Sequence, residues 1–381
     1  MYPPLRNLLF CLLSVSLLGG CWDAREIEER TSVIALGIDK HPEGYEISVQ
    51  VPVPLKIVGS GGGGGGGGES GQNAVQIFSG TGKTVSDTLD DIQNQTNQQL
   101  FLGQAQILLF GEEVAKDGIG RVVDGLKRRP EIRRRQWPLV VKGKAKDAMK
   151  ANPKLEQIPM EYIITMMENG SRMGKYNDED FGKTLINLSS PAKHPMMNFM
   201  EISPQQIEWK GLAVFKKGKL VGHLSREESE PMLRLRNKER GETINVPCGG
   251  KKSNLKVVFW PKKMKRKIRV KQRSGRLPEI LVHIKMNGDI IEKTCAKYDL
   301  SQPGIYKKMN RWVADRYELT TRKTVRKMQK EIKVDAFHFG NMIRAHHPDM
   351  WKKLDWNRDF PNVPIRATYE VQIRRTGLEF K

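Results

Sequence analysis

Cys21 is the residue whose type and position point most directly to chemistry. It follows a short hydrophobic run at residues 8–18 and two glycines, and a single positive charge, Arg6, precedes the run. A charged start, an apolar stretch and small residues before a cleavage point are the parts of a secretory signal. The letters LLGGC at residues 17–21 resemble a bacterial lipobox, in which the cysteine thiol receives a diacylglycerol. We therefore expect cleavage after Gly20 and an N-palmitoyl and S-diacylglycerol cysteine at Cys21.

This segment has two other interpretations. Cys21 could be an ordinary cysteine behind a general secretory signal. A retained transmembrane helix is disfavoured, because the apolar run is shorter than the roughly 20 residues needed to cross a bilayer. The polar residues 22–26 also end the run abruptly. Two acyl chains hold a protein at a membrane stably, whereas one holds it only marginally.

The remaining cysteines and histidines give weaker signals. Cys11 leaves with the signal, so Cys248 and Cys295 are the other two cysteines of the mature chain. An exported protein can bridge such a pair, but the spacing gives little support, and two free thiols are the favoured interpretation. His346 and His347 stand directly before a proline, which predicts a surface loop rather than a metal site.

No pattern in the sequence predicts an enzyme. No nucleophile or zinc motif occurs, and no pair of carboxylates is singled out by its spacing. We therefore expect no catalytic residues, no metal and no cofactor. A cell-envelope hydrolase, one alternative for an exported protein, lacks the acid and base that it would need.

Composition and charge describe a folded body with a strong positive balance. The chain has 381 residues, of which 38% are hydrophobic and 28% charged, so two or three folded domains are expected. The formal net charge is +22, and loss of residues 1–20 removes only Arg6, which leaves +21. Such a charge suits nucleic acid, anionic lipid or an acidic partner. The export signal argues against nucleic acid and favours an anionic membrane beside the anchor.

The first half alternates strand and helix patterns. Residues 31–39 and 45–51 read as a hairpin, and residues 74–80, 105–111 and 138–143 read as further strands. Helix patterns lie between and after the strands, from a cap at Thr84 or Ser86, at 112–128, and over much of 147–190. The alternation predicts an α/β arrangement. The eight consecutive glycines at residues 61–68 predict a loop, because glycine loses the most entropy on ordering.

The second half predicts a sheet and a long helix. Strands are expected at 206–215, 220–224, 243–246, 255–260, 267–272, 279–286 and 367–374, and an antiparallel sheet is the expected arrangement. Alternation along residues 267–271 (KIRVK) places the charges on one face, either a solvated face or an anion-binding one. Residues 303–330 predict the longest helix, and helical spacing predicts that Trp312 is a buried core anchor. The predicted fold class is therefore α+β or mixed α/β with more than one domain.

Several motifs resemble one family. CWD at 21–23 running into VIALGID at 33–39 resembles the start of the Ger(x)C family of spore germination lipoproteins. FGEEVA at 110–115 and RPEIR at 129–133 resemble its middle. The following segments resemble the C-terminal half of the family: GLAVFKK at 211–217, KVDAFHFG at 333–340, PDMWK at 348–352 and Trp356. The glycine run is a departure that looks like an inserted loop.

The resemblance implies a function and a location. Members of the family are non-enzymatic C subunits of nutrient germinant receptors. They are lipid-anchored on the outer face of the spore inner membrane, beside membrane-embedded A and B subunits. On this basis residues 1–20 are a lipoprotein signal, 21–200 an N-terminal germination-protein domain that could split near 150, and 201–381 a C-terminal one. A solute-binding lipoprotein of an envelope transport system is the alternative, although no repeated two-lobed pattern of βα units supports it.

Overall fold

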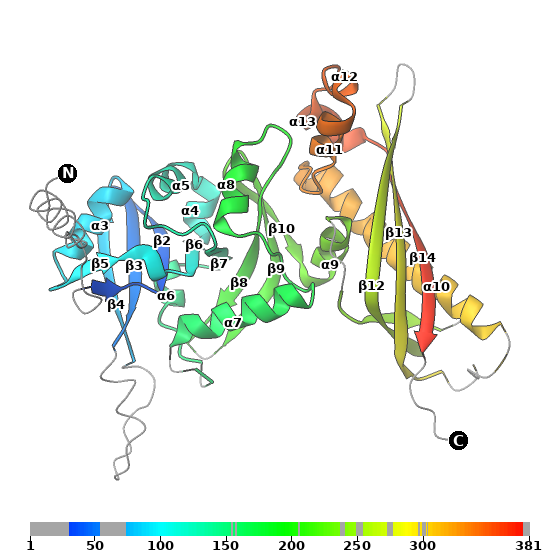
Figure 1. Cartoon of the computed structure of the whole chain (residues 1–381), viewed down its shortest axis with the longest axis horizontal. Helices are drawn as coiled ribbons and strands as arrows, with labels where there is room; N and C mark the ends of the chain where they lie inside the picture. Colours follow the sequence, from blue (N-terminus) through cyan, green and yellow to red (C-terminus); the bar gives the residue numbers. More distant parts are fainter. Residues whose placement is uncertain are drawn as a thin grey trace, which may run out of the picture.

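The computed structural model describes most of the chain after its first 29 residues. The described residues are 30–53, 74–153, 155–156, 158–204, 206–236, 241–248, 254–272, 277–295, 298, 302 and 304–375. Cys21 and the glycine run at 61–68 lie outside them. Figure 1 shows an elongated molecule in which one large sheet occupies the N-terminal part and a second, smaller sheet with a long helix occupies the C-terminal end.

The first sheet has eight strands in the order β10-β9-β8-β7-β6-β2-β3-β4. The central strands β8, β7, β6 and β2 are parallel, and antiparallel pairs complete both edges. A separate short parallel pair is formed by β1 (Arg30–Ser32) and β5 (Gln99–Phe101). The strands of the first sheet are β2 (Ala35–His41), β3 (Gly44–Pro52), β4 (Val75–Gly82), β6 (Ile107–Gly111), β7 (Trp137–Val141), β8 (Met196–Ile202), β9 (Ile207–Lys216) and β10 (Lys219–Ser225).

Helices cover both faces of this sheet. Leu108 and Phe110 of β6 belong to one core, with α3 (Val85–Gln93), α4 (Glu112–Asp117), α5 (Gly120–Lys127) and α8 (Phe181–Ser189). Ile107 and Leu109, their neighbours along the strand, belong to the other core, with α6 (Ala145–Ala148) and α7 (Pro159–Arg172). Because both faces are buried, β6 is an unbroken hydrophobic run, as expected for a parallel strand covered on two sides.

Local sequence signals explain where several helices begin. Thr84 caps α3 with a capping box, since its hydroxyl accepts the amide hydrogen of Asp87 at 3.1 Å and the Asp87 carboxylate accepts that of Thr84 at 3.2 Å. Ser225 and Glu228 form the same arrangement at α9 (Arg226–Leu235). These contacts satisfy backbone donors that the first turn of a helix leaves unpaired.

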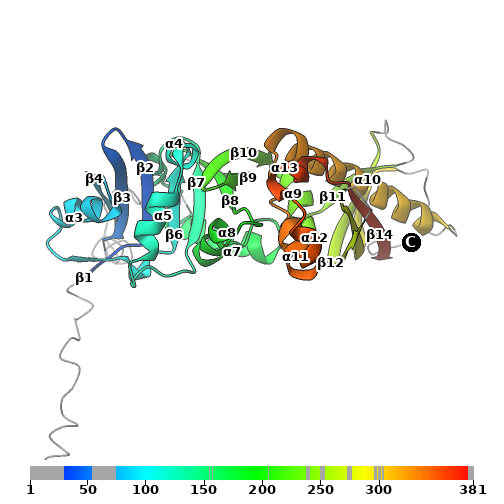
Figure 2. The same ribbon diagram turned by 90° about the horizontal axis from the view of Figure 1, so that it is seen from above.

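The second sheet has four strands, β11 (Ile244–Pro247), β12 (Lys256–Lys271), β13 (Glu279–Lys293) and β14 (Ile365–Arg375), in that order. The pairs β11–β12 and β12–β13 are antiparallel, as predicted, whereas β14 lies parallel to β13. Helix α10 (Ile305–Lys327) packs on one face of this sheet, and Figures 1 and 2 agree that it lies behind the strands. The chain returns to β14 through short segments: the π-helical η3 (Met328–Ile332), α11 (Phe339–His346), α12 (Pro348–Trp351), α13 (Trp356–Asp359) and the 3-10 turn η4 (Phe360–Asn362).

The mixed α/β N-terminal part and the C-terminal sheet with a long helix confirm the predicted fold class. The predicted domain boundary at residues 200 and 201 stays a prediction, and the first sheet itself continues to Ser225 because β9 and β10 form one of its edges. The core that lies under α6 and α7 is continuous with the core of the second sheet, and Met232 and Leu233 of α9 belong to it.

Several predicted element boundaries were wrong. The single helix predicted at 112–128 is two helices, because Gly118 adopts a φ of +128° and Ile119 bonds instead to the Gly218 carbonyl at 2.9 Å. The strands predicted at 255–260 and 267–272 are one strand, β12, with register shifts near Val258 and Pro261. The helical region predicted at 147–190 divides into α6, α7 and α8.

Candidate interaction surface

One face of the second sheet is left open by the packing of α10. Along β12, Phe259, Met264 and other inward residues are buried, whereas the alternate residues are exposed. We call the outward face of β12, β13 and β14 the open face. Its central part consists of these residues: Lys263, Lys265, Lys267, Arg269 and Lys271 of β12, Leu281, His283 and Lys285 of β13, and Arg366, Thr368 and Glu370 of β14. The alternation predicted for residues 267–271 is confirmed and extends further toward the start of the strand.

The strand register places basic residues beside one another on this face. Lys265 is paired with Lys285, and Lys267 with His283. Directly opposed side chains on one face of a sheet lie about 4.5–5.5 Å apart at Cβ. Local sequence patterns do not predict this convergence, because the residues of β13 and β14 are brought beside the basic strand only by the strand register.

A few carboxylates partly balance the basic residues. The Glu370 carboxylate forms an ion pair with Lys285 Nζ at 2.8 Å and lies 3.3 Å from His283 Nε2. The hydrogen bond from Lys285, followed by that from His283, lowers the pKa of Glu370. Arg366 Nε lies 3.2 Å from the Glu279 carboxylate. A hollow of about 560 Å³ lies on this part of the face, between the basic row of β12 and Arg366.

The row on β12 carries the excess charge. Lys263, Lys265, Lys267, Arg269 and Lys271 are all exposed. Within the part of the chain that the structure describes, none of the five forms an ion pair with a carboxylate. The open face therefore presents uncompensated positive charge over adjacent strands.

The opposite face of the sheet is held by an aromatic and charged cluster. Tyr317 of α10 is fully buried and stacks on Tyr369 of β14, with ring centroids 5.3 Å apart. The guanidinium of Arg234 lies 4.4 Å from the Tyr317 ring centroid and forms an ion pair with Glu230. Burial disfavours the charged guanidinium, but Glu230 and the two tyrosines reverse this effect and raise the pKa of Arg234. The prediction that Trp312 is the core anchor was wrong, because its side chain is only half-buried and Tyr317 takes that place.

The KVDAFHFG segment joins the two parts of the molecule. His338 has a φ of +66°, and its ring Nε2 lies 3.1 Å from the His194 carbonyl oxygen, which belongs to the first part. Arg236 contacts both His338 and the buried carboxylate of Glu179. Burial, reinforced by the nearby Arg236 charge, lowers the pKa of His338 to about 3, so the ring is neutral at physiological pH.

A buried carboxylate orders the helices after this join. Asp335 accepts hydrogen bonds from the Gly340 amide at 2.7 Å and from Trp356 Nε1 at 2.9 Å. Burial raises the pKa of Asp335 to about 6, although these hydrogen bonds oppose the shift. These contacts give Asp335 and Trp356 a structural role, because they hold the segments after the join against one another.

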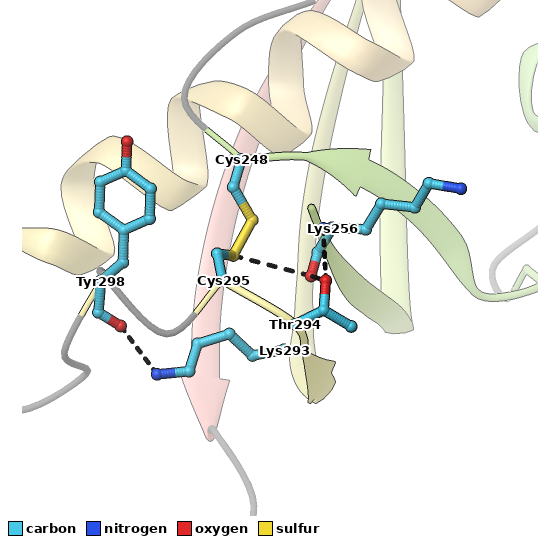
Figure 3. The surroundings of a disulfide bond; sticks show 6 residues. All are labelled: Cys248, Lys256, Lys293, Thr294, Cys295 and Tyr298. Atoms are coloured by element: carbon cyan, nitrogen blue, oxygen red, sulfur yellow. Dashed lines mark hydrogen bonds between the residues drawn. A yellow bond between two sulfur atoms is a disulfide. The ribbon is translucent and has the colours of Figure 1, made fainter. Parts of the chain in front are cut away.

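A disulfide joins Cys248 and Cys295, so the expectation of two free thiols was wrong. Figure 3 shows the bridge at the end of β13, beside the contacts between Thr294 and Lys256. The Thr294 amide donates to the Lys256 carbonyl at 2.9 Å, and the Lys256 amide donates to the Thr294 hydroxyl at 2.8 Å. Both cysteines are buried. The bridge ties the segment that follows the short edge strand β11 to the end of β13. Disulfides are typical of proteins in oxidising compartments, which agrees with the export predicted from the sequence.

The other candidate residues do not gather into a site. His346 and His347 are exposed at the end of α11, as predicted for a surface position. No group of three potential metal ligands occurs among the described residues. None of the helices in the described ranges has the length and apolar character that a membrane span requires. Cys21, the predicted lipid acceptor, lies outside the described residues.

Comparisons with known proteins match nearly the whole chain. A family model described as the spore germination protein N-terminal domain matches residues 23–202, and one described as spore germination B3/GerAC like, C-terminal, matches residues 210–377. The chain is 29% identical to spore germination protein KC of Bacillus subtilis (strain 168), over 96% of this chain and 94% of that protein. It is 23% identical to spore germination protein GerQC of Bacillus cereus, over 98% and 99% respectively. The crystal structure of the GerBC protein has the same fold, with a TM-score of 0.58 and 20% identity over 89% of this chain and 96% of that one.

Proposed function

Because the chain belongs to the Ger(x)C family of spore germination proteins, we propose that it is the lipid-anchored, non-catalytic C subunit of a nutrient germinant receptor. In this role it stands on the outer face of the spore inner membrane, beside membrane-embedded A and B subunits. The observation that carries the proposal is the match to spore germination proteins along both halves of the chain. The fold shared with the GerBC protein supports the same assignment.

The positions of the titratable groups support a function in binding rather than in catalysis. The groups with the largest shifts in pKa among the described residues, such as Asp335 and His338, are buried and hold neighbouring elements together. A catalytic acid or base would instead face a cleft where substrate could reach it. The most distinctive exposed feature is the open face, which is suited to binding a surface.

The proposed anchor is tested by metabolic labelling with a fatty-acid probe. Cys21→Ala removes the acceptor thiol, so labelling is lost and an uncleaved or mislocalised precursor accumulates. A variant with Cys248→Ala and Cys295→Ala is the matched control and keeps the label, because those two cysteines form the disulfide. Labelling of the Cys21→Ala variant at the wild-type level would refute the anchor.

The proposed assembly is tested by purification from spore membranes. A tagged chain is expected to bring down two membrane-embedded subunits encoded as its receptor partners, and Cys21→Ala should reduce their recovery by removing the chain from the membrane. Recovery of the chain alone, at normal abundance and with an intact anchor, would contradict the receptor assignment. Calorimetric titration with small nutrients distinguishes the alternative, since a solute-binding lipoprotein would bind one by itself.

A further inference from the structure

We propose that the open face of the C-terminal sheet lies against an anionic membrane surface, where its lysines and arginines meet lipid phosphates. This inference deepens the proposed function, on which it rests only for the presence of a membrane beside the protein. The surface itself is argued from charge and register. The occupant is a lipid surface, and an acidic polypeptide is the competing occupant that the experiment below must exclude.

The spacing of the charges makes them act together. Alternate residues of a strand lie about 6.8 Å apart, so the cations from Lys263 to Lys271 form a regular row. The screening length at physiological salt is about 8 Å, which exceeds this spacing. The potentials of neighbouring charges therefore add, and the row attracts an extended anionic surface more strongly than any single residue would.

Without a partner, the basic residues of the open face destabilise the sheet. Lys265 is paired with Lys285, and like charges directly opposite one another on a sheet face are destabilising. Glu370 relieves Lys285 by an ion pair at 2.8 Å, but the described residues provide no comparable partner for Lys265. An external layer of negative charge would relieve this repulsion.

The basic residues are spread over three strands rather than gathered at one point. Lys265 and Lys267 of β12 lie beside Lys285 and His283 of β13, and Arg366 of β14 lies beside Leu281, with neighbouring strands about 4.8 Å apart. Basic residues close to an anionic bilayer each add to the attraction. Cations distributed over several strands therefore suit an extended anionic surface.

Apolar side chains continue the same face at one end. Trp260 of β12 and Ile291 of β13 are 43% and 51% exposed, although they are large and hydrophobic. Lys262 Nζ lies 2.8 Å from the Trp260 ring centroid. Tryptophan beside a lysine is typical of the interfacial region of membranes, where the ring is partly buried and the charge meets the headgroups.

The placement of the N-terminal end is compatible with this orientation. In Figure 2, β1 lies along the lower side of the molecule, the open face of the sheet is turned to that side, and α10 lies on the opposite side. Eight residues separate the proposed anchor Cys21 from Arg30, the first residue of β1, and this stretch can span at most about 30 Å. Anchor and open face can therefore meet one membrane.

The experiment measures co-sedimentation of the chain with lipid vesicles. A chain beginning at Trp22 keeps every described residue and removes the anchor, so the result does not depend on lipidation. Wild-type chain is expected to bind vesicles of equal phosphatidylcholine and phosphatidylglycerol, to bind phosphatidylcholine vesicles far more weakly, and to be released by high salt. The test variant carries Lys265→Glu, Lys267→Glu and Arg269→Glu. Each basic residue contributes about fivefold to such binding, so loss of the three charges alone should lower affinity about 100-fold, and their reversal should lower it further.

A matched control changes the charge equally on the other side of the same sheet. Lys307, Lys308 and Lys323 are exposed on α10, and replacing all three by glutamate should leave vesicle affinity within severalfold of the wild type. Circular dichroism and thermal unfolding establish that both variants fold, and glutamine substitutions at the three test positions provide a milder second variant that should lose about 100-fold.

Three results would overturn the proposal. The first is no binding of the wild-type chain to anionic vesicles at low salt. The second is an equal loss of affinity in the test and control variants, which would reduce the effect to net charge. The third is displacement from vesicles by soluble poly-glutamate at concentrations too low to screen charge, which would assign the face to an acidic polypeptide. The receptor assignment is tested separately by subunit recovery, so failure here leaves it standing.

Discussion

The two sheets of this molecule are built from similar strands but are covered differently. In the first sheet, Leu108 and Leu109 are neighbours on β6, and both are fully buried because helices lie on both faces. In the second sheet, Ile284 of β13 is buried under α10, whereas its neighbour Lys285 is exposed on the open face. The first sheet therefore serves as a scaffold, because the faces of its central strands are covered. The second sheet leaves one face exposed, and that face can bind a partner.

Charge follows the same division. Strand β6 in the middle of the first sheet is a hydrophobic run, ILLFG at 107–111, and all five of its residues are buried. The second sheet alternates inward apolar and outward basic residues along β12. Coverage of the second sheet by one helix leaves its other face to water, and the sequence fills that face with cations rather than with a balanced mixture. We take this as evidence that the face is a binding surface.

Charged substitutions at neighbouring positions should reveal the difference most strongly. Leu108→Glu and Leu109→Glu each bury an unpaired charge in the first sheet, so each should lower the free energy of unfolding by about 5 kcal/mol or more. In the second sheet Ile284→Glu should have a similar effect. Lys285→Gln should change stability by less than about 1 kcal/mol, because it only loosens an exposed ion pair.

Chemical denaturation monitored by circular dichroism measures these values. The comparison between the sheets would fail if one of the two β6 variants were as stable as the wild type. It would also fail if Lys285→Gln were as damaging as Ile284→Glu.

The side of the second sheet that faces α10 should depend on Tyr317 more than on Trp312. Tyr317 is fully buried between Arg234 and Tyr369, so Tyr317→Ala should cost about 3–5 kcal/mol. Trp312 is half-buried, and Trp312→Ala should cost clearly less. Thermal unfolding of the two variants tests the ranking, and an equal or larger loss for Trp312→Ala would restore the expectation drawn from helical spacing alone.

The disulfide should stabilise the second sheet and leave the first unaffected. Cys248 and Cys295 are separated by 47 positions, and closing a loop of this length in the unfolded chain stabilises the folded state by about 2–4 kcal/mol. Replacing both cysteines by alanine should lower stability by that amount. Hydrogen exchange should locate the loosening in β11 and the end of β13, and protection lost first in β6 or β7 would contradict this placement.

A pH effect should also be confined to the C-terminal part. The pKa of Asp335 is about 6 in the folded protein and 3.8 by its ordinary value, so the folded state holds the proton more tightly. The stabilisation linked to this proton is complete below about pH 4 and is lost as the pH rises through 6. Between pH 4 and 7 the wild type should lose roughly 2.5 kcal/mol relative to Asp335→Asn, which cannot ionise.

Urea unfolding of both proteins across this pH range gives the difference directly. Because the comparison subtracts every other titrating group, a difference that stays flat with pH would show that Asp335 keeps an ordinary pKa. A difference of the opposite sign would show that its hydrogen bonds from Gly340 and Trp356 outweigh burial.

The sequence predicted the elements better than their assembly. Buried strands such as 107–111, the cap at Thr84 and the alternation along 267–271 are local patterns, and the structure confirms them. The break at Gly118 was missed, because the hydrophobic spacing continues through it and only the contact of Ile119 with the Gly218 carbonyl reveals it.

Long-range pairing was beyond the reach of local patterns. The disulfide joins two cysteines whose spacing carries no signal, since their approach depends on how β11 and β13 are placed around β12. The open face likewise requires the register that sets Lys265 opposite Lys285 and Leu281 opposite Arg366. The sequence alone predicts only the basic row on β12. The basic surface extends over three strands, and this extent depends on their register.

The most direct test of this account is the germination of spores in response to nutrients. Spores lacking their own copy would be supplied with one of two full-length variants at equal protein levels. One variant carries the three open-face reversals at Lys265, Lys267 and Arg269, and the other carries the three α10 reversals at 307, 308 and 323. We predict that the open-face variant loses most of the response and the α10 variant retains it. Equal, near wild-type responses from both would contradict the claim that the open face is the working surface of this protein.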